Sequence, residues 1–252
     1  MIELPFDPLE RAEKVESLVM EDLSRRYYRF RPARYYGGIA TADLVGCCFL
    51  CAYCWNFARN LHPEQSRARC YSPREVGQRL LDIARQRGYS KVRLSGAEPL
   101  LGHRSFEHVL HVLGHVTAAE PRMEFILETN GFLLGHSPEL ADRLARFRKL
   151  AVRVSLKGWD EASFQKISGA EGSFFELPLR GLKTMLDRGI QAWPAVMYET
   201  FGASGIEEIH RRMEQLGMRP EELELEYLEV YPFVLENLKK RSVCLKASPL
   251  AI

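Results

Sequence analysis

Three cysteines on one short segment carry the clearest chemical signal in the sequence. Cys47, Cys51 and Cys54 follow the spacing C-x3-C-x2-C. Three thiolates this close together can bind three irons of a four-iron, four-sulfur (4Fe–4S) cluster. The fourth iron then lacks a protein ligand, and an open coordination position on a metal indicates catalysis rather than a structural role. The segment therefore predicts a catalytic iron–sulfur site.

A structural zinc site is an alternative for part of this segment. Cys51 and Cys54 form a C-x2-C pair, which zinc favours, and Cys70 or His62 could complete the ligand set. A zinc knuckle usually has a second C-x2-C or C-x2-H pair further along, and the sequence has none. The zinc interpretation therefore stays open as the second choice.

The register of the cysteines is also ambiguous. Starting from Cys48, the spacing becomes C-x2-C-x2-C, which is typical of the start of a ferredoxin-type run. Such a run needs a fourth cysteine followed by proline, whereas Trp55 follows the last cysteine here. The remaining cysteines are expected to be buried small hydrophobic residues rather than ligands: Cys48, Cys70 and Cys244.

An aromatic residue, Tyr53, immediately precedes Cys54 and completes the pattern C-x3-C-x-aromatic-C. In this respect the chain resembles the radical S-adenosylmethionine (SAM) superfamily. The resemblance implies a 4Fe–4S cluster on Cys47, Cys51 and Cys54, with SAM as the second cofactor and Tyr53 among the residues that bind it. It also implies an α/β fold, a partial (βα)6 barrel with an open six-stranded parallel sheet and helices outside.

Ser95 is followed by Gly96, Ala97, Glu98 and Pro99, which look like the Gly-Gly-Glu-Pro motif of this superfamily. The resemblance implies that the backbone and the Glu98 carboxylate receive the amino group of SAM, and a charge-assisted hydrogen bond suits that task. Ala97 replaces the second glycine, which is tolerated only where φ is negative. The alternative is an ordinary turn between a strand and a helix.

A second motif is similar to one in the branch that activates glycyl-radical enzymes. Glu128, Thr129, Asn130 and Gly131 resemble the acidic-Thr-Asn-Gly stretch of that branch. The resemblance implies that Glu128 or Asn130 lies near the ribose hydroxyls or the methionyl end of SAM. Asn and Gly also favour tight turns, so a simple turn is the alternative.

Three polar side chains alternate with apolar ones over residues 150–157. Arg153, Ser155 and Lys157 therefore face the same side of a strand. Lys157, at the end of that strand, is a candidate for the SAM carboxylate or ribose. The branch has Asp-Leu-Lys here and Ser155 replaces the Asp, so a cation site or substrate contact at that position is not carried over. Arg153 has two interpretations, a cofactor contact or a buried ion pair.

The elements that position these motifs follow an alternating pattern. Strands are expected at 38–45, 91–95, 123–129, 150–156, 190–197 and 223–231. Helices are expected between them, over 72–88, 105–119, 138–149 and 205–216, and further helical stretches follow the strand 150–156 and reach Arg188. Strands that alternate with helices indicate a parallel sheet. Functional groups in such barrels lie at the C-terminal ends of strands, where the cysteines and the polar motifs fall.

Composition agrees with a cytoplasmic enzyme. The chain has 252 residues, 46% of them hydrophobic and 27% charged, which is ordinary for one globular domain. The first residues lack the basic region and apolar core of a signal peptide, and no apolar run approaches membrane-spanning length. Six cysteines in this context indicate reduced thiols and metal chemistry. The net charge of +2 gives no information on partners.

The segment from Arg25 to Tyr36 interleaves arginines with aromatic residues. This composition suits RNA or a ribose-phosphate ligand. The alternative is an amphipathic helix and strap with arginines that extend to solvent. We do not expect nucleic acid as a partner, because one short stretch on a nearly neutral protein is weak support. The expected organisation is a helical, basic and aromatic extension (1–38), a radical SAM barrel (39–233) and a tail (234–252).

The predicted function is reductive cleavage of SAM to methionine and a 5′-deoxyadenosyl radical, which abstracts hydrogen from a substrate. That substrate is a partner protein, as for the activating enzymes, or a small molecule. The expected electron donor is of the flavodoxin or ferredoxin type, and the expected state is a monomer without membrane contact. Trp55, Asn56 and Trp193 are candidates for excluding water. The alternative is a non-catalytic iron–sulfur or zinc protein that binds nucleic acid through residues 25–36.

Overall fold

Six parallel strands form the centre of the fold in the structure, a computed structural model that describes residues 3–246. They are β3 (Ile39–Leu44), β5 (Lys91–Ser95), β6 (Glu124–Thr129), β7 (Leu150–Ser155), β8 (Gln191–Met197) and β9 (Glu224–Glu226). Beyond β3, the antiparallel strands β1 (Met20–Glu21), β2 (Ser24–Ala33) and β4 (Arg69–Tyr71) extend the sheet. The order is β1-β2-β3-β5-β6-β7-β8-β9, with β4 paired to β2. The prediction of an open sheet with six parallel strands is confirmed.

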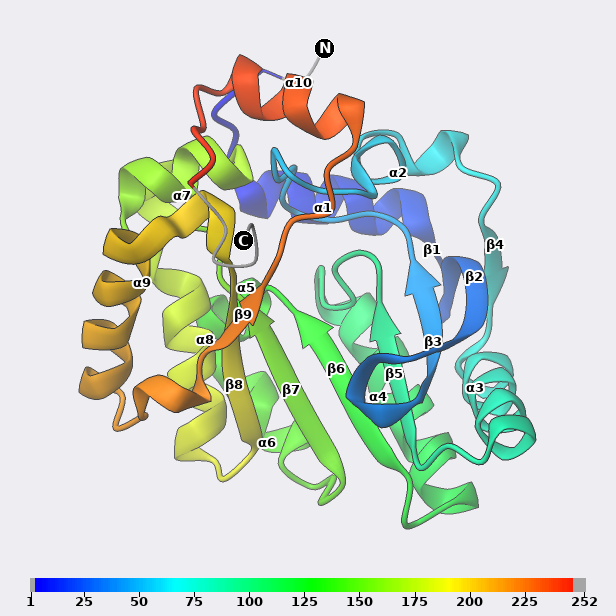
Figure 1. Cartoon of the computed structure of the whole chain (residues 1–252). Helices are drawn as coiled ribbons and strands as arrows, with labels where there is room; N and C mark the ends of the chain where they lie inside the picture. The colour runs from blue at the N-terminus through cyan, green and yellow to red at the C-terminus, as the bar shows by residue number, and fades with distance from the viewer. Residues whose placement is uncertain (1–2, 247–252) are drawn as a thin grey trace.

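Helices connect and surround these strands. They are α1 (Pro8–Val19), α2 (Phe57–Leu61), α3 (Pro73–Arg87), α4 (His103–Ala119), α5 (Phe132–His136), α6 (Ala141–Leu144), α7 (Glu161–Ser168), α8 (Glu176–Asp187), α9 (Tyr198–Gln215) and α10 (Pro232–Lys240). Figure 1 shows α1, α2 and α10 beyond the C-terminal ends of the parallel strands, where the arrowheads point. Among the residues that the structure describes, none of the helices combines the length and apolar character that a membrane span requires.

Local sequence signals fix the ends of α3 as expected. The Ser72 hydroxyl accepts a hydrogen bond from the Glu75 amide at 3.3 Å, and the Glu75 carboxylate accepts one from the Ser72 amide at 2.8 Å. This reciprocal capping box satisfies two amides that would otherwise lack partners at the helix start. Gly88 ends the helix in the left-handed region with φ +67°, a conformation that glycine adopts without a steric penalty. By contrast, the helix expected over 138–149 is only the short 3-10 turn Pro138–Leu140 followed by α6.

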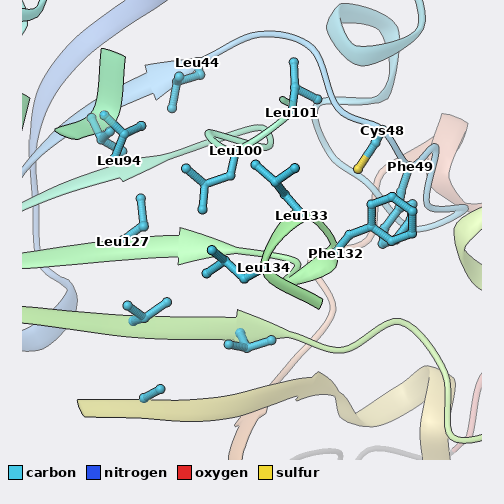
Figure 2. Close-up of a cluster of buried hydrophobic side chains, with 14 of the residues drawn as sticks. Leu44, Cys48, Phe49, Leu94, Leu100, Leu101, Leu127, Phe132, Leu133 and Leu134 are labelled. Atoms are coloured by element: carbon cyan, nitrogen blue, oxygen red, sulfur yellow. The ribbon is translucent and has the colours of Figure 1, made fainter. Parts of the chain in front are cut away.

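The hydrophobic core lies between the sheet and the helices, and it reaches the cysteine segment. Figure 2 shows Leu94 of β5 and Leu127 of β6 in one cluster with residues 132–134 of α5 and with Cys48 and Phe49. The Phe49 ring lies 5.5 Å from the Phe132 ring, measured between centroids, and 5.3 Å from the Phe164 ring. Such edge-to-face pairs stabilise aromatic clusters beyond the area they bury. The cysteine segment is therefore anchored in the core through the residues between its ligand candidates.

The arginine- and aromatic-rich segment is mostly a strand rather than a strap. Residues 24–33 form β2, which pairs with β3 and has a bulge between Tyr27 and Arg29. A bulge inserts one extra residue and re-aims the side chains that follow it. Tyr27 accordingly packs into the core, whereas Arg29 and Arg31 both lie opposite β3 on the side of Asp43. Residues from the expected extension thus belong to the same sheet as the barrel.

The last strand is shorter than expected. The predicted strand 223–231 forms ladder pairs only over Glu224–Glu226, against β8. Beyond it, the Leu228 amide donates to the Glu199 carboxylate at 3.0 Å. Figure 1 shows this segment rising in front of the sheet from β9 to α10. The chain leaves the ladder because β9 is the edge strand and has a neighbour on one side only.

Candidate functional site

A cavity of about 720 Å³ lies at the C-terminal ends of the parallel strands. Every residue predicted to bind a cofactor or metal lines it: Cys47, Cys51, Tyr53, Cys54, Gly96, Ala97, Glu98, Glu128, Asn130, Ser155 and Lys157. These residues come from four separate segments of the sequence. The fold brings them together because the C-terminal ends of parallel strands meet at one edge of a sheet.

The structure separates the two registers of the cysteines. Cys47, Cys51 and Cys54 line the cavity, whereas Cys48 does not. The Cys48 side chain is fully buried, and its sulfur accepts a hydrogen bond from the Asn130 Nδ2 at 3.1 Å. Figure 2 shows Cys48 beside the core leucines. The geometry therefore favours C-x3-C-x2-C as the ligand set and leaves Cys48 in the core.

The expectation for the other two spare cysteines was wrong. Cys70 is partly exposed and Cys244 is exposed, so neither is a buried hydrophobic residue. Cys70 lies on β4, a short strand that pairs only with β2, and one face of it reaches solvent. Cys244 follows α10 at the surface. Neither residue lines the cavity.

Backbone contacts hold the cysteine segment in place. The Leu50 amide donates to the Ser168 carbonyl at 2.9 Å, and the Ala52 amide donates to the Ile167 carbonyl at 2.8 Å. Gly46 precedes the segment with φ +88°, and a Cβ there would lie 2.7 Å from the Val15 side chain. Only glycine accommodates both the positive φ and this close approach. The three thiols thus project from a segment with a fixed backbone.

Two asparagines connect this segment to its surroundings. Asn60 accepts a hydrogen bond from the Gly46 amide at 3.1 Å, and its Nδ2 lies 3.5 Å from the Cys54 sulfur. Asn56 donates from Nδ2 to the Gly96 carbonyl at 2.7 Å, which links the cysteine segment to the glycine-containing loop. Asn56 was expected to exclude water, and its buried position is compatible with that task.

The three thiols differ in acidity. Hydrogen bonds from the Cys48 thiol and the Phe49 amide lower the pKa of Cys47 to about 7, against the effect of burial. Burial raises the pKa of Cys51 to about 12 and that of Cys54 to about 11. Metal ligands must be thiolates, so binding of iron would release protons from Cys51 and Cys54.

The three thiols supply the donor atoms that an iron–sulfur cluster takes. Among residues 3–246, no group of three His, Cys, Asp or Glu side chains is arranged to hold one metal ion. Cluster cysteines bind different irons, so their sulfurs need not meet at one point. The donor set, three cavity-facing thiols without a fourth protein ligand, is the one that a 4Fe–4S cluster with an open iron requires.

Glu98 has a different position from the one expected. Its carboxylate accepts hydrogen bonds from the Leu100 amide at 2.9 Å, the Thr129 hydroxyl at 2.6 Å and the Asn130 amide at 2.7 Å. Burial, together with the charge of Cys47, raises its pKa to about 8. Both oxygens are thus engaged by the protein, and the Glu98 side chain connects the loops after β5 and β6. The Ala97 carbonyl is left to receive a ligand amino group, whereas the Gly96 carbonyl already accepts from Asn56.

The Asn130 side chain also forms its hydrogen bonds within the protein rather than pointing free into the cavity. Its Oδ1 accepts from the Phe132 amide at 2.9 Å and its Nδ2 donates to Cys48, as described above. The first contact is the local side-chain-to-backbone bond by which Asn stabilises turns. The turn interpretation of Glu128–Gly131 therefore accounts for the Asn130 side chain, although the first three residues of this stretch line the cavity.

Glu128 is the acceptor in a polar network across the cavity floor. Arg93 donates to it at 2.6 Å, Tyr36 donates at 3.3 Å, and the Ser95 hydroxyl also hydrogen-bonds to it. Arg93 in turn donates from Nε to the Thr41 hydroxyl at 2.9 Å. Glu128 therefore carries a paired charge, and a ribose hydroxyl would have to join this network to reach it.

Arg153 forms a buried ion pair, the second of its two interpretations. Its Nε lies 3.0 Å from Glu224 and its Nη2 lies 2.8 Å from Glu226. Nη1 donates to the Ser155 hydroxyl at 3.1 Å. The coulombic effect of Glu226 and the other carboxylates outweighs burial and raises the pKa of Arg153. Arg153 of β7 thus reaches past β8 to hold β9 in position, and Ser155 takes part in that contact.

Lys157 is a cation that acts on all three thiols of the cavity. Its Nζ lies 5.4 Å from the centroid of the Tyr53 ring. Burial opposes its charge, but Tyr53, Cys51 and Glu226 outweigh burial and raise its pKa. A charged lysine at this point can bind a carboxylate close to the thiols.

Sequence reasoning missed the arginines of β2. Arg29 and Arg31 line the cavity, and Arg25 is fully buried behind the cysteine segment, where its Nη2 donates to the carbonyls of Val45 and Glu98 at 3.1 and 3.0 Å. Their signal, arginines that alternate with aromatic residues, was visible but was attributed to an external arm. Two tryptophans were expected to exclude water. Trp55 lines the cavity, whereas Trp193 does not line it and donates a hydrogen bond to Glu224 at 2.6 Å.

Comparison with known proteins identifies the family. Residues 43–214, about two thirds of the chain, match the model of the Radical SAM superfamily. The chain therefore belongs to the Radical SAM superfamily. Membership implies SAM and a 4Fe–4S cluster as cofactors, in agreement with the thiols of the cavity.

The chain is similar to two GTP 3',8-cyclases. It is 36% identical over 138 residues to the enzyme of Mycolicibacterium smegmatis (strain ATCC 700084 / mc(2)155), an alignment that covers 53% of this chain and 36% of that enzyme. It is 39% identical over 94 residues to the enzyme of Synechococcus sp. (strain CC9902), covering 37% of this chain and 26% of that enzyme. The chain thus spans about a third or less of the length of these relatives.

Two solved structures share the fold. A spore photoproduct lyase mutant with bound AdoMet and dinucleoside spore photoproduct has a TM-score of 0.58 and 12% identity, covering 92% of this chain and 67% of that one. SuiB of Streptococcus suis bound to S-adenosylmethionine has a TM-score of 0.56 and 17% identity, covering 79% of this chain and 44% of that one. These comparisons leave the activating-enzyme branch as a prediction.

Proposed function

We propose that this chain cleaves SAM reductively at the cavity and directs the resulting 5′-deoxyadenosyl radical to a substrate hydrogen. The observation that carries the proposal is the selective orientation of the thiols. Cys47, Cys51 and Cys54 face the same cavity as the candidate SAM residues, and the fourth thiol of the segment, Cys48, is excluded from it.

The proposed roles follow from the side chains. Cys47, Cys51 and Cys54 hold the cluster, which supplies the electron that cleaves the sulfonium of SAM when both cofactors are bound. The Lys157 ammonium binds the SAM carboxylate by a charge-assisted hydrogen bond. The Ala97 carbonyl receives the SAM amino group, while Asn56 holds the Gly96 carbonyl and Glu98 positions that loop through the three bonds described above.

Tyr53 completes the wall between the thiols and Lys157. Its ring is buried, and its hydroxyl donates a hydrogen bond to none of the residues that the structure describes. A buried hydroxyl without an acceptor carries a free-energy cost, which a bound ligand relieves by accepting a hydrogen bond from it. Tyr53 is therefore assigned to the cofactor-binding residues. The same wall keeps water from the site where the radical forms.

A small molecule is the proposed substrate. The named activity of the relatives, GTP 3',8-cyclase, concerns a small molecule, and a volume of about 720 Å³ is within the range of small-molecule sites. The proposed electron donor is a flavodoxin or ferredoxin, and the proposed state is a cytoplasmic monomer.

A partner protein is the second candidate substrate, as in activating enzymes. The supporting observation is a pair of exposed aromatic side chains at the cavity: Tyr231 lines it, and the Tyr231 ring stacks on the Phe233 ring with centroids 5.7 Å apart. Exposed apolar residues that gather next to a site are typical of a protein contact.

Product analysis tests the proposed cleavage. The protein is reconstituted anaerobically with iron and sulfide, reduced with dithionite and mixed with SAM, and the products are separated by chromatography. The expected result is 5′-deoxyadenosine in amounts that depend on the reductant. A reconstituted protein with four irons per chain that forms no 5′-deoxyadenosine would contradict the proposal.

A further inference from the structure

The charges that line the cavity are distributed unevenly along the sheet. At β2 and β3, two guanidinium groups, Arg29 and Arg31, share one carboxylate, Asp43. In the middle, Arg93 and Glu128 form a pair of one cation and one anion. The cavity is thus basic at the end near β2.

At the end of the cavity near β9, carboxylates outnumber guanidinium groups. At β7 and β9, two carboxylates, Glu224 and Glu226, share the single guanidinium of Arg153. All three residues line the same cavity as Arg29 and Arg31. Among these arginine and carboxylate groups, the surplus is one positive charge at β2 and one negative charge at β9. Lys157 also lines the cavity and adds a cation near Glu226, so the negative surplus at β9 is offset. The cation surplus at β2 attracts the anionic group of a ligand.

Asp43 is sufficiently paired without Arg29. Arg31 approaches Asp43 with two nitrogens, Nε at 2.7 Å from Oδ2 and Nη2 at 3.4 Å from Oδ1. Arg29 adds a third contact through Nε alone, at 2.7 Å. Asp43 is fully buried, and one guanidinium in this forked arrangement already compensates its charge. Arg29 is thus the surplus cation.

The contact to Asp43 also orients Arg29. Nε is the only atom of Arg29 that contacts Asp43, and among residues 3–246 no carboxylate or carbonyl accepts a hydrogen bond from its two Nη groups. The Arg29 side chain is 44% exposed and lies at the cavity lining. A guanidinium held in this manner presents a fork of donors that matches a carboxylate or a phosphate.

Aromatic side chains flank this cation. The Arg29 guanidinium lies 6.0 Å from the Trp55 ring centroid and 5.4 Å from that of Tyr28. Trp55 is 44% exposed, lines the cavity and directly follows Cys54. An exposed tryptophan beside a cation gives the rest of a ligand an apolar surface to pack against. Its position after Cys54 places that surface next to the thiols.

We infer that Arg29, supported by Arg31, is an anion subsite for the substrate, which carries a carboxylate or a phosphate group. This inference rests on the proposed function, because it concerns the substrate of the same cavity. The anionic group binds the Arg29 fork, and the adjoining part of the substrate packs on Trp55 near the site of the radical. The chain presents one Arg29 fork, so one substrate anion binds per chain.

Anion titration of the holoprotein tests the inference. Reconstituted, SAM-loaded protein is titrated calorimetrically at low ionic strength with inorganic pyrophosphate in one series and malonate in the other. Saturable binding of one anion per chain is expected for at least one probe, and the preferred probe distinguishes a phosphate from a carboxylate. Arg29→Gln should weaken that binding at least about tenfold, because it removes a charge-assisted fork. Arg29→Lys, which keeps the charge but loses the fork, should fall between.

Arg26→Gln is the matched control on the same strand. Arg26 pairs with Glu21 and does not line the cavity, so anion affinity should be unchanged. The inference is overturned if neither probe binds the wild-type protein, or if Arg29→Gln binds as tightly as Arg26→Gln while melting at the same temperature as the wild type. Formation of 5′-deoxyadenosine by the wild type is measured in parallel. Its absence refutes the proposed function, whereas its presence without anion binding refutes only the subsite.

Discussion

At the scale of single residues, the orientation of the four thiols of residues 47–54 determines which three of them can bind a cluster. The spacing alone allowed a start at Cys47 or at Cys48, because both registers place three cysteines within eight residues. The structure favours Cys47, since Cys48 is turned into the core and bound by Asn130. Sequence could not supply this orientation, which depends on Asn130, a residue 82 positions away.

Iron content of two neighbouring variants tests this orientation. Cys47→Ala should lose the cluster, because it removes one of three ligands, and chemical analysis should find well below four irons per reconstituted chain. Cys48→Ala should retain four irons and lose about 1–2 kcal/mol of stability through the small cavity it leaves. Loss of iron in Cys48→Ala with retention in Cys47→Ala would reverse the register.

The residue scale also shows what motif resemblance conveys and what it does not. The three residues that the resemblance indicated, Glu98, Asn130 and Lys157, line one cavity. The resemblance did not reveal that the side chains of Glu98 and Asn130 hydrogen-bond to backbone amides of the loops, because hydrogen-bond partners follow from tertiary contacts. The role of Arg153 likewise follows from a tertiary contact. The sequence left a cofactor contact and a buried ion pair as alternatives, and the two carboxylates of β9 beside Arg153 show the ion pair.

At the scale of elements, β2 is the feature that sequence reasoning placed least well. Its alternation of arginine and aromatic residues is interrupted by the bulge between Tyr27 and Arg29, which obscures the period of a strand. Arg25 is buried, which propensity does not anticipate for a charged residue. By contrast, the capping box of α3 was predictable because its signals are local.

The contact between β2 and α4 makes a prediction about acid stability. His108 of α4 is buried, and its ring nitrogens bond the Tyr27 hydroxyl at 2.9 Å and the Leu23 carbonyl at 2.7 Å. Burial, with smaller effects of Arg25 and His111, lowers its pKa from 6.5 to about 4. The unfolded chain therefore binds more protons than the folded one between these values, so stability is highest above about pH 6.5 and falls as the pH drops toward 4.

Denaturant unfolding at several pH values measures this dependence. Between pH 6.5 and pH 4 the His108 contribution should amount to about 3 kcal/mol of lost unfolding free energy. His108→Gln lacks the titrating group, so its unfolding free energy should decline less over the same range, even if it starts lower. Equal declines in the two proteins would mean that His108 does not cause the acid sensitivity.

At the scale of the whole molecule, the prediction of six parallel strands and an open sheet was correct because alternating strands and helices are encoded along the whole chain. The antiparallel extension by β2 and the early end of β9 were not predictable, since both depend on which strands lie beside them. β2 carries the surplus cation Arg29, and β9 carries the two carboxylates that share Arg153. The features that sequence alone misplaced are thus the ones that bear on the substrate.

The central claim is that three thiols hold a cluster whose fourth iron is open to SAM. Electron paramagnetic resonance of the dithionite-reduced, reconstituted protein, recorded before and after addition of SAM, tests it most directly. The account predicts the signal of a reduced 4Fe–4S cluster whose g values shift when SAM binds the open iron. A 4Fe–4S signal that SAM leaves unchanged, or reconstituted protein without such a signal, would contradict the account.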